Sequence, residues 1–87
     1  MDYRIDTPFA HTPEPRAGEL GAALGYNVRR LRTEQHLTKQ TFAMMVGIGR
    51  PFLDKIESGE ADPRLSLVIR LADALSVTPE DLLALSL

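Results

Sequence analysis

The chain has 87 residues, of which 44% are apolar and 25% are charged, and its formal net charge is −2. These values predict one small globular domain. The absence of cysteine excludes disulfides, thiolate metal sites and cysteine nucleophiles. The N-terminus lacks the basic flank and apolar run of a signal peptide, and no apolar stretch is long enough to cross a bilayer, so we expect a cytoplasmic protein. Residues 20–75 carry eight cations against six acids, so the middle of the chain is mildly cationic.

A flexible N-terminal tail is expected over residues 1–17, ahead of a folded domain over residues 18–87. The tail contains three prolines and shows no helical or strand periodicity. The first helix is expected from Leu20 to about Gln35, because leucine and valine recur there at spacings of three and four residues.

Two short helices separated by a glycine-containing turn are expected next. Thr38 is a suitable N-cap for the first, and Gly47 is expected to end it in a left-handed conformation. The second, residues 50–58, has Pro51 in its first turn, where no helical hydrogen bond is lost. The apolar residues expected to face the core are Phe42, Ala43, Val46, Ile48, Phe52, Leu53 and Ile56.

Two further helices complete the expected fold. One should open at Asp62-Pro63, with its buried side formed by Leu65, Val68, Ile69, Ala72 and Leu75. The other, TPEDLLAL (78–85), has Thr78 as its N-cap and proline and two acids in its first turn. No segment alternates with period two for long enough to form a strand. The sequence therefore predicts a compact all-α domain of five helices.

Neither an enzyme nor a cofactor site is indicated. Gly47 and Gly49 begin a G-x-G sequence, but Phe52 occupies the position of the third glycine of a dinucleotide loop, and no strand precedes it. The acids from Asp54 to Asp62 lack the alternating spacing of a calcium loop. Neither histidine has a carboxylate or serine partner at a useful spacing. We therefore expect no catalysis, no cofactor and no metal.

The helices and the glycine turn at residues 38–58 together form a helix-turn-helix pattern, whose second helix enters the major groove of DNA. Four stretches of this sequence, and the distances between them, are typical of one family: LGYNVRRLR (24–32), LTKQTFAMMVGI (37–48), RPFLDKIESGEADPRL (50–65) and LADALSVTPEDLL (71–83). Through them the chain resembles the phage repressors and Cro proteins, also called xenobiotic-response-element-like regulators. The resemblance implies a lambda-repressor-like fold that binds double-stranded DNA.

The resemblance also implies roles for individual residues. Arg32 and Glu57 correspond to a structural ion pair. The positions that contact DNA bases correspond to Gly49, Arg50, Pro51 and Lys55. The positions that contact the DNA backbone correspond to Thr38, Lys39, Ser58 and Arg64. The family prefers glutamine where Lys39 stands; lysine can neutralise a phosphate but cannot make the paired contacts of an amide.

The chemistry of the second helix allows several roles for its charged residues. Arg50 and Lys55 can each donate to O6 and N7 of guanine, and Pro51 offers an apolar contact to a thymine methyl. Asp54 follows Arg50 by four residues, so it can hold that guanidinium in one rotamer, or it can accept from a cytosine amino group. Phosphate contact and plain surface charge remain alternatives for both cations. Solvated positions are expected for Arg29, Arg30 and Arg70.

The C-terminal leucines indicate an interface. Leu82, Leu83, Leu85 and Leu87 provide more apolar surface than a short final helix can hide, so we expect two in the core and the others in a homodimer contact. A repressor is preferred, because the chain has no room for a ligand-sensing domain. Two alternatives stay open: an antitoxin whose tail binds a toxin or another regulator, and a protein-interaction module. Glu60, Asp62, Asp54 and the low net charge favour the second alternative, and Glu60 and Asp62 lie in a loop where phosphates should approach.

Overall fold

The computed structural model describes residues 17–85, which form five α-helices and no strand. The helices are α1 (Ala17–Glu34), α2 (Lys39–Val46), α3 (Arg50–Glu57), α4 (Leu65–Leu75) and α5 (Pro79–Leu83). The expected all-α, five-helix fold is confirmed for this part of the chain. The expected tail lies outside the described residues except for Ala17, and so does Leu87. None of the described helices is long and apolar enough to cross a membrane.

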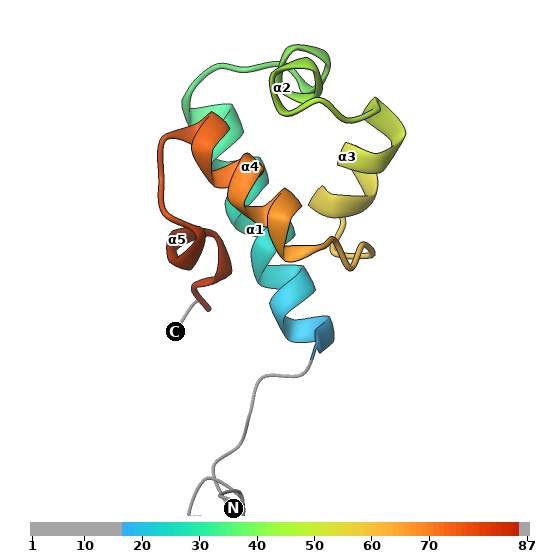
Figure 1. Ribbon diagram of the computed structural model, residues 1–87, viewed down its shortest axis with the longest axis vertical. Helices are drawn as coiled ribbons and strands as arrows, with labels where there is room; N and C mark the ends of the chain where they lie inside the picture. Colours follow the sequence, from blue (N-terminus) through green and yellow to red (C-terminus); the bar gives the residue numbers. More distant parts are fainter. Residues whose placement is uncertain (1–16, 86–87) are drawn as a thin grey trace, which may run out of the picture.

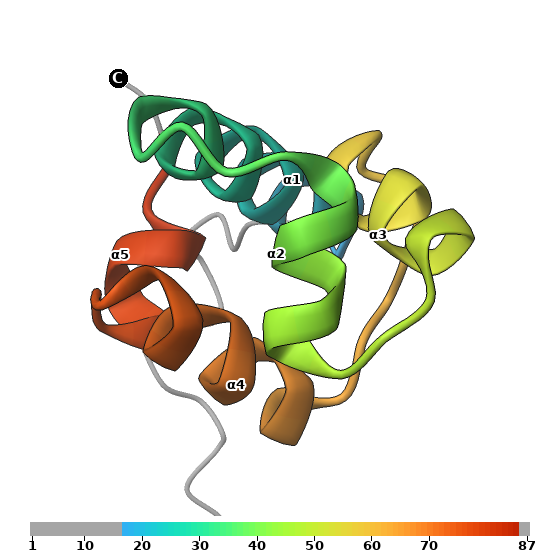
Figure 2. The same cartoon turned by 90° about the horizontal axis from the view of Figure 1, so that it is seen from above.

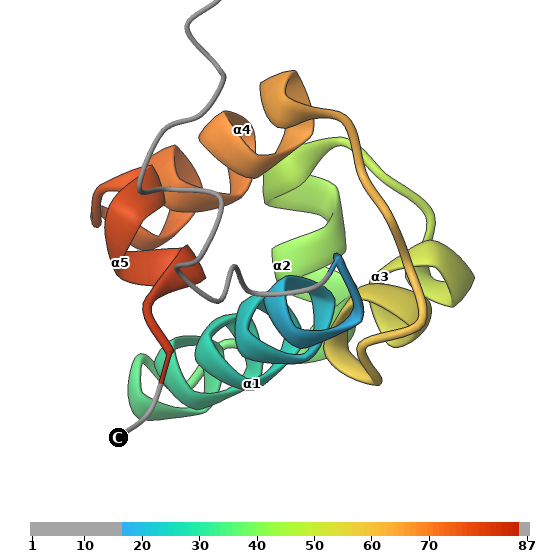
Figure 3. The same ribbon diagram turned by 90° about the horizontal axis from the view of Figure 1, so that it is seen from below.

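The helices pack so that α3 and α5 lie on opposite sides of the molecule (Figure 1). α1 packs against α5, α3 and α4, and α2 packs against α3 and α4. Seen from above and from below, α2 stands between α1 and α4 (Figures 2 and 3). One side of α3 packs against α1 and α2, and the other side faces solvent.

One continuous core joins all five helices. Its largest completely buried side chains are Phe42 of α2, Leu53 and Ile56 of α3, and Leu71 of α4. The other buried apolar residues are Leu24, Val28, Ala43, Val46, Leu67, Val68, Ala72, Leu75 and Leu82. Burial of this apolar surface is the main stabilising term for such a small domain.

The ends of the short helices are held by local hydrogen bonds. The Thr38 hydroxyl oxygen accepts from the backbone N–H of Thr41 at 3.1 Å and so caps α2. Thr78 and Asp81 form a reciprocal capping box at the start of α5, with both hydrogen bonds at 3.1 Å. Each device satisfies N–H groups that have no partner within the helix.

The sequence-based boundaries of the last two helices were too generous. α4 begins at Leu65, not at Asp62-Pro63, because Arg64 is extended (φ −64°, ψ 153°) and serves as the N-cap. Residues 61–64 are irregular. α5 ends at Leu83, since Ala84 is also extended.

Three residues expected in the core are instead exposed. Leu65 is 66% exposed and Ile69 is 44% exposed, because the inward side of α4 is formed by Leu67 and Leu71 together with Val68, Ala72 and Leu75. Phe52 is 38% exposed, at the edge of the buried side of α3. These expectations were wrong because an apolar periodicity of three and four fits two neighbouring faces of one helix.

α1 and α3 approach each other closely at Gly25. A Cβ atom at this position would lie 2.4 Å from the carbonyl oxygen of Ile56 and 2.8 Å from that of Glu57. No side chain fits there, so the glycine that weakens α1 as a helix allows the C-terminal end of α3 to rest against it.

Candidate nucleic-acid interface

The turn at residues 47–49 joins α2 to α3 and changes the direction of the chain between these two packed helices. The N–H groups of Gly47 and Ile48 donate to the carbonyl oxygen of Ala43 at 2.8 and 3.0 Å. Gly47 is left-handed (φ 85°), and an added Cβ would lie 2.9 Å from a guanidinium nitrogen of Arg70. The left-handed conformation therefore favours glycine here, whereas the end of the Arg70 side chain could move aside for a Cβ. Ala43, 3% exposed, is the small residue in the core beside this turn.

The outward side of α3 carries the cations that the sequence singled out. Leu53 and Ile56 are buried, whereas Arg50, Pro51 and Lys55 are exposed. Gly49 is extended and precedes the helix as its N-cap, without a side-chain hydrogen bond. Within residues 17–85 the side chains of Arg50 and Lys55 take part in no hydrogen bond or ion pair. Both positive charges are therefore available to an external ligand.

Asp54 is paired differently from the expectation. The sequence suggested that it holds Arg50 four residues earlier, but its Oδ1 lies 2.9 Å from Nζ of Lys39, at the start of α2. The packing of α2 against α3 brings these two side chains together, and no spacing within one helix predicts it. The pKa of Asp54 is lowered, chiefly by the hydrogen bond from Lys39, against desolvation, with further contributions from the charges of Lys39, Arg50 and Arg32.

The remaining candidates for DNA-backbone contact lie at helix ends. Thr38 is exposed and caps α2, and its hydroxyl oxygen is occupied by the N–H of Thr41. Ser58, after α3, donates from its hydroxyl to the carbonyl oxygen of Lys55 at 3.0 Å. Arg64 is exposed just before α4. Together with Lys39 they are distributed over the loops and helix ends around α3.

A buried ion pair between α1 and α3 helps to fix the position of α3. Nε of Arg32 donates to Oε2 of Glu57 at 2.6 Å, and an Nη donates to Oε1 at 3.1 Å. The other Nη donates to the carbonyl oxygen of Leu37 at 2.8 Å. Both side chains are less than 10% exposed. One guanidinium therefore connects α1, the loop before α2 and the end of α3, with its main donors satisfied.

Comparison with known proteins identifies this architecture. The family model described as helix-turn-helix, HTH_3, matches residues 28–82, which include α2, the turn and α3. The chain belongs to the HTH_3 helix-turn-helix family. Members of this family are DNA-binding transcription regulators of the xenobiotic-response-element type.

Solved structures agree with this assignment. The restriction-modification controller protein C.AhdI from Aeromonas hydrophila is 31% identical, with a TM-score of 0.68 over 71% of this chain and 94% of that chain. The hypothetical transcription factor NHTF from Neisseria is 27% identical, with a TM-score of 0.74 over 85% of each chain. The clp gene regulator ClgR from C. glutamicum is 26% identical, with a TM-score of 0.69 over 83% of this chain and 88% of that chain. A search of curated proteins finds no match.

Two residues of this HTH_3 domain have structural roles that the sequence did not reveal. Arg70 was expected to be solvated, but it donates to the carbonyl oxygens of Val46 and Gly47 and so satisfies the C-terminal end of α2. Asn27, 5% exposed, donates to the carbonyl oxygens of Leu82 and Ala84 at 2.9 and 3.0 Å. The one sign of this role in the sequence is that Asn27 is a polar residue beside the apolar stripe of α1.

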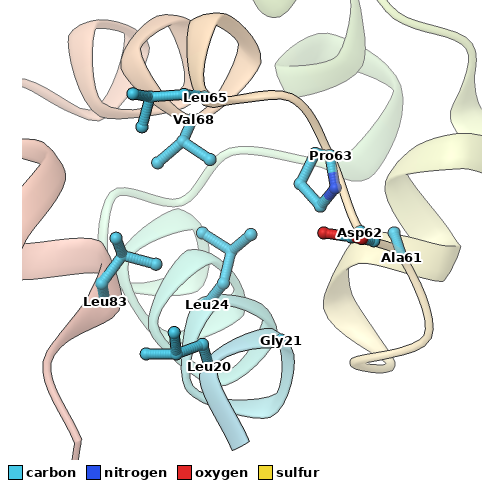
Figure 4. Close-up of a pocket in the computed structure, with 9 residues that line it drawn as sticks. All are labelled: Leu20, Gly21, Leu24, Ala61, Asp62, Pro63, Leu65, Val68 and Leu83. Carbon is cyan, nitrogen blue, oxygen red and sulfur yellow. The ribbon is translucent and has the colours of Figure 1, made fainter. Parts of the chain in front are cut away.

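A second concave site of the HTH_3 domain lies away from α3. Side chains of α1, the loop before α4, α4 and α5 surround it, with Leu20, Leu24, Leu65, Val68 and Leu83 supplying the apolar lining (Figure 4). Of the described residues that line it, Asp62 alone is charged. Among the described residues no group of three histidine, cysteine or acidic side chains could hold a metal. The part of the groove that residues 17–85 line is therefore mostly apolar.

Proposed function

We propose that this HTH_3 domain reads a short operator by inserting the N-terminal half of α3 into the major groove of double-stranded DNA. The observation that carries this proposal is the exposure of Arg50 and Lys55 on α3 while Leu53 and Ile56 of the same helix are buried. Two cations on the outward side of the second helix match the geometry by which this motif contacts base edges. Arg50 and Lys55 would donate to guanine, and Pro51 would contact a thymine methyl.

Contacts to the sugar–phosphate backbone would set the register of α3 in the groove. Gly49 allows the backbone before α3 to approach DNA closely, since it has no side chain. The polar and cationic groups proposed to contact phosphates are Thr38, Lys39, Ser58 and Arg64. Such contacts supply most of the affinity through counterion release but carry no sequence information.

We further propose that two copies bind one palindromic operator in the cytoplasm and repress transcription. Tyr26 is 58% exposed and Leu85 is 44% exposed, and both line a groove with Ala22, Ala23 and Ala84. The groove is formed by residues of α1 and by the residues that follow α5, and α5 lies on the side of the molecule opposite α3 (Figures 1 and 3). A two-fold contact there leaves both copies of α3 free to enter grooves about 34 Å apart.

A protein-interaction module is the second candidate function. Glu60 and Asp62 favour it, because both are exposed in the loop after α3, where phosphates would approach. A protein partner such as a toxin or another regulator would use this acidic loop. A salt titration separates the two functions, since DNA binding weakens steeply as salt rises and the interaction module would show no duplex binding even at about 50 mM salt.

The proposed readout is tested by selecting bound duplexes from a random pool with the wild-type protein and with Arg50→Ala. If Arg50 reads guanine, its loss costs about 1–3 kcal/mol and abolishes the preference at one position of the selected site. Arg29→Ala removes an exposed arginine of α1 and is the matched control; it should keep every base preference. Equal weakening of all sequences by Arg50→Ala would assign Arg50 to phosphate contact instead.

A further inference from the structure

The ion pair between Lys39 and Asp54 lies on the surface that the proposed function turns toward DNA. Asp54 is in the middle of α3, one helical turn after Arg50, and its side chain is 47% exposed. Lys39 is the first residue of α2, and its side chain is 37% exposed. Neither group is buried, so an external ligand can reach the carboxylate and the ammonium together.

A carboxylate at this position is unfavourable for DNA binding in general. Its charge opposes the approach of phosphates, and it weakens the attraction that Arg50 and Lys55 exert. Lys39 offsets this effect because its ammonium lies 2.9 Å from Oδ1 of Asp54. The same contact orients the carboxylate, and within residues 17–85 its second oxygen takes part in no hydrogen bond or ion pair.

The chemistry of the second carboxylate oxygen of Asp54 limits the groups that it can bind. An ionised carboxylate accepts hydrogen bonds and donates none. In the major groove the available donors are the amino groups of cytosine and adenine, and acidic side chains pair with the N4 amino group of cytosine. The hydrogen bond from Lys39 lowers the pKa of Asp54, against desolvation, and the charges of Lys39, Arg50 and Arg32 lower it further, so the carboxyl is ionised at neutral pH.

We propose that Asp54 is a specificity-determining residue that accepts a hydrogen bond from a cytosine amino group, while Lys39 positions its carboxylate. The assignment rests on the proposed function, because it requires α3 to enter the major groove. Four residues of helix span about 6 Å, and one base-pair step spans about 3.4 Å. Asp54 and Arg50 would therefore read a cytosine and a guanine at most two base pairs apart.

The assignment predicts a change of base preference at one position only. Duplexes are selected from a random pool by the wild-type protein, Asp54→Ala and Asp54→Asn, and thermal unfolding of each variant verifies that it is folded. Wild type should prefer cytosine over other bases by about five- to tenfold at one position within two base pairs of the Arg50-dependent guanine. Asp54→Ala should lose that preference and keep the guanine. Asp54→Asn should shift it toward adenine, which asparagine recognises.

One control variant and one variant of Lys39 complete the experiment. Asp73→Asn makes the same charge change on the exposed surface of α4 and should leave all base preferences unchanged. Lys39→Gln keeps a polar side chain but removes the ammonium; it should reduce the cytosine preference at the same position, an effect that a purely structural role in holding α2 against α3 would not have.

Three results would overturn the proposal, and they are distinguishable. If Asp54→Ala strengthens binding to every duplex and leaves the preferred bases unchanged, Asp54 only repels phosphate. If the variant selects the same site with the same affinity, the carboxylate does not touch DNA. In both cases the proposed function stands, because wild type still selects a site. If wild type enriches no sequence, the proposed function fails and the role of Asp54 fails with it.

Discussion

Gly25 determines how closely α1 and α3 can approach. The carbonyl oxygens of Ile56 and Glu57 lie where a side chain would begin, at 2.4 and 2.8 Å from an added Cβ. Since both neighbours are backbone atoms at the end of α3, they cannot rotate out of the way as a side chain would. Any side chain at position 25 must therefore move α3 relative to α1.

Gly25→Ala is expected to destabilise the protein by about 1–3 kcal/mol, even though alanine favours helix by about 1 kcal/mol. Urea unfolding monitored by circular dichroism measures the change. Gly18→Ala is the matched control in the same helix, because nothing lies within 4 Å of its added Cβ; that variant should be as stable as wild type or slightly more stable. Equal stability of both variants would show that α3 can shift at no cost.

At the level of single residues, helical periodicity accounts for part of the candidate site. Once Leu53 and Ile56 are taken as buried, the exposure of Arg50, Pro51 and Lys55 follows from the 3.6-residue repeat. The Lys39–Asp54 pair does not follow, since it joins two helices and depends on how they pack. Arg70 was missed for the same reason: its partners, the carbonyl oxygens of Val46 and Gly47, belong to another helix.

Among the helices, α5 is the shortest, and a polar side chain of α1 binds its C-terminal end. It is only five residues long, too short to be stable alone. The side chain of Asn27 on α1 donates to the carbonyl oxygens of Leu82 and Ala84, at and just beyond its C-terminal end. Leu82 is completely buried beside this contact. Asn27 therefore fixes where the chain leaves the domain.

Asn27→Ala should lower the free energy of unfolding by about 1–3 kcal/mol, because it leaves the Leu82 carbonyl without its donor in a buried setting. Urea unfolding at neutral pH checks this value. Gln35→Ala provides the comparison: it removes one hydrogen bond to the Leu75 carbonyl from an exposed residue, so its cost should be smaller. No measurable cost for Asn27→Ala would mean that α5 is held by apolar packing alone.

Helix type and order could be predicted, whereas some boundaries could not. The caps Thr38, Gly47 and Thr78 have distinctive residue types and sit where the sequence indicated. The start of α4 was placed too early because Asp62-Pro63 is a common helix opening. Here that pair is part of the irregular loop at residues 61–64, and Arg64, which makes no side-chain cap, takes the N-cap position.

For the whole molecule, the proposed two-fold contact is the property that most affects function. A single copy offers few phosphate contacts, which corresponds to non-specific affinities of about 10⁻⁴–10⁻⁶ M. Tyr26 of α1 and Leu85, which follows α5, are both exposed. Burial of these side chains between two copies would combine two readouts in one binding event.

Leu85→Glu should convert a dimer to a monomer and weaken binding to a palindromic operator, while binding to a half-site stays unchanged. Analytical ultracentrifugation and duplex titration measure the two effects. Leu65→Glu is the matched control, because Leu65 is a 66% exposed leucine of α4 outside the proposed contact. A wild-type protein that is monomeric both in solution and on its operator would contradict the two-fold contact.

The division of α3 into two sides has a consequence for how this domain can change. On its inner side, Leu53 and Ile56 are part of the core and Glu57 forms an ion pair with Arg32. The outer side chains Arg50, Pro51 and Lys55 support nothing else in the described part of the chain, and substitutions at such surface positions usually alter stability by less than about 0.5 kcal/mol. On the proposed function, substitution of these outer residues would therefore change which operator the domain prefers, while the buried side of α3 and the fold stay as they are.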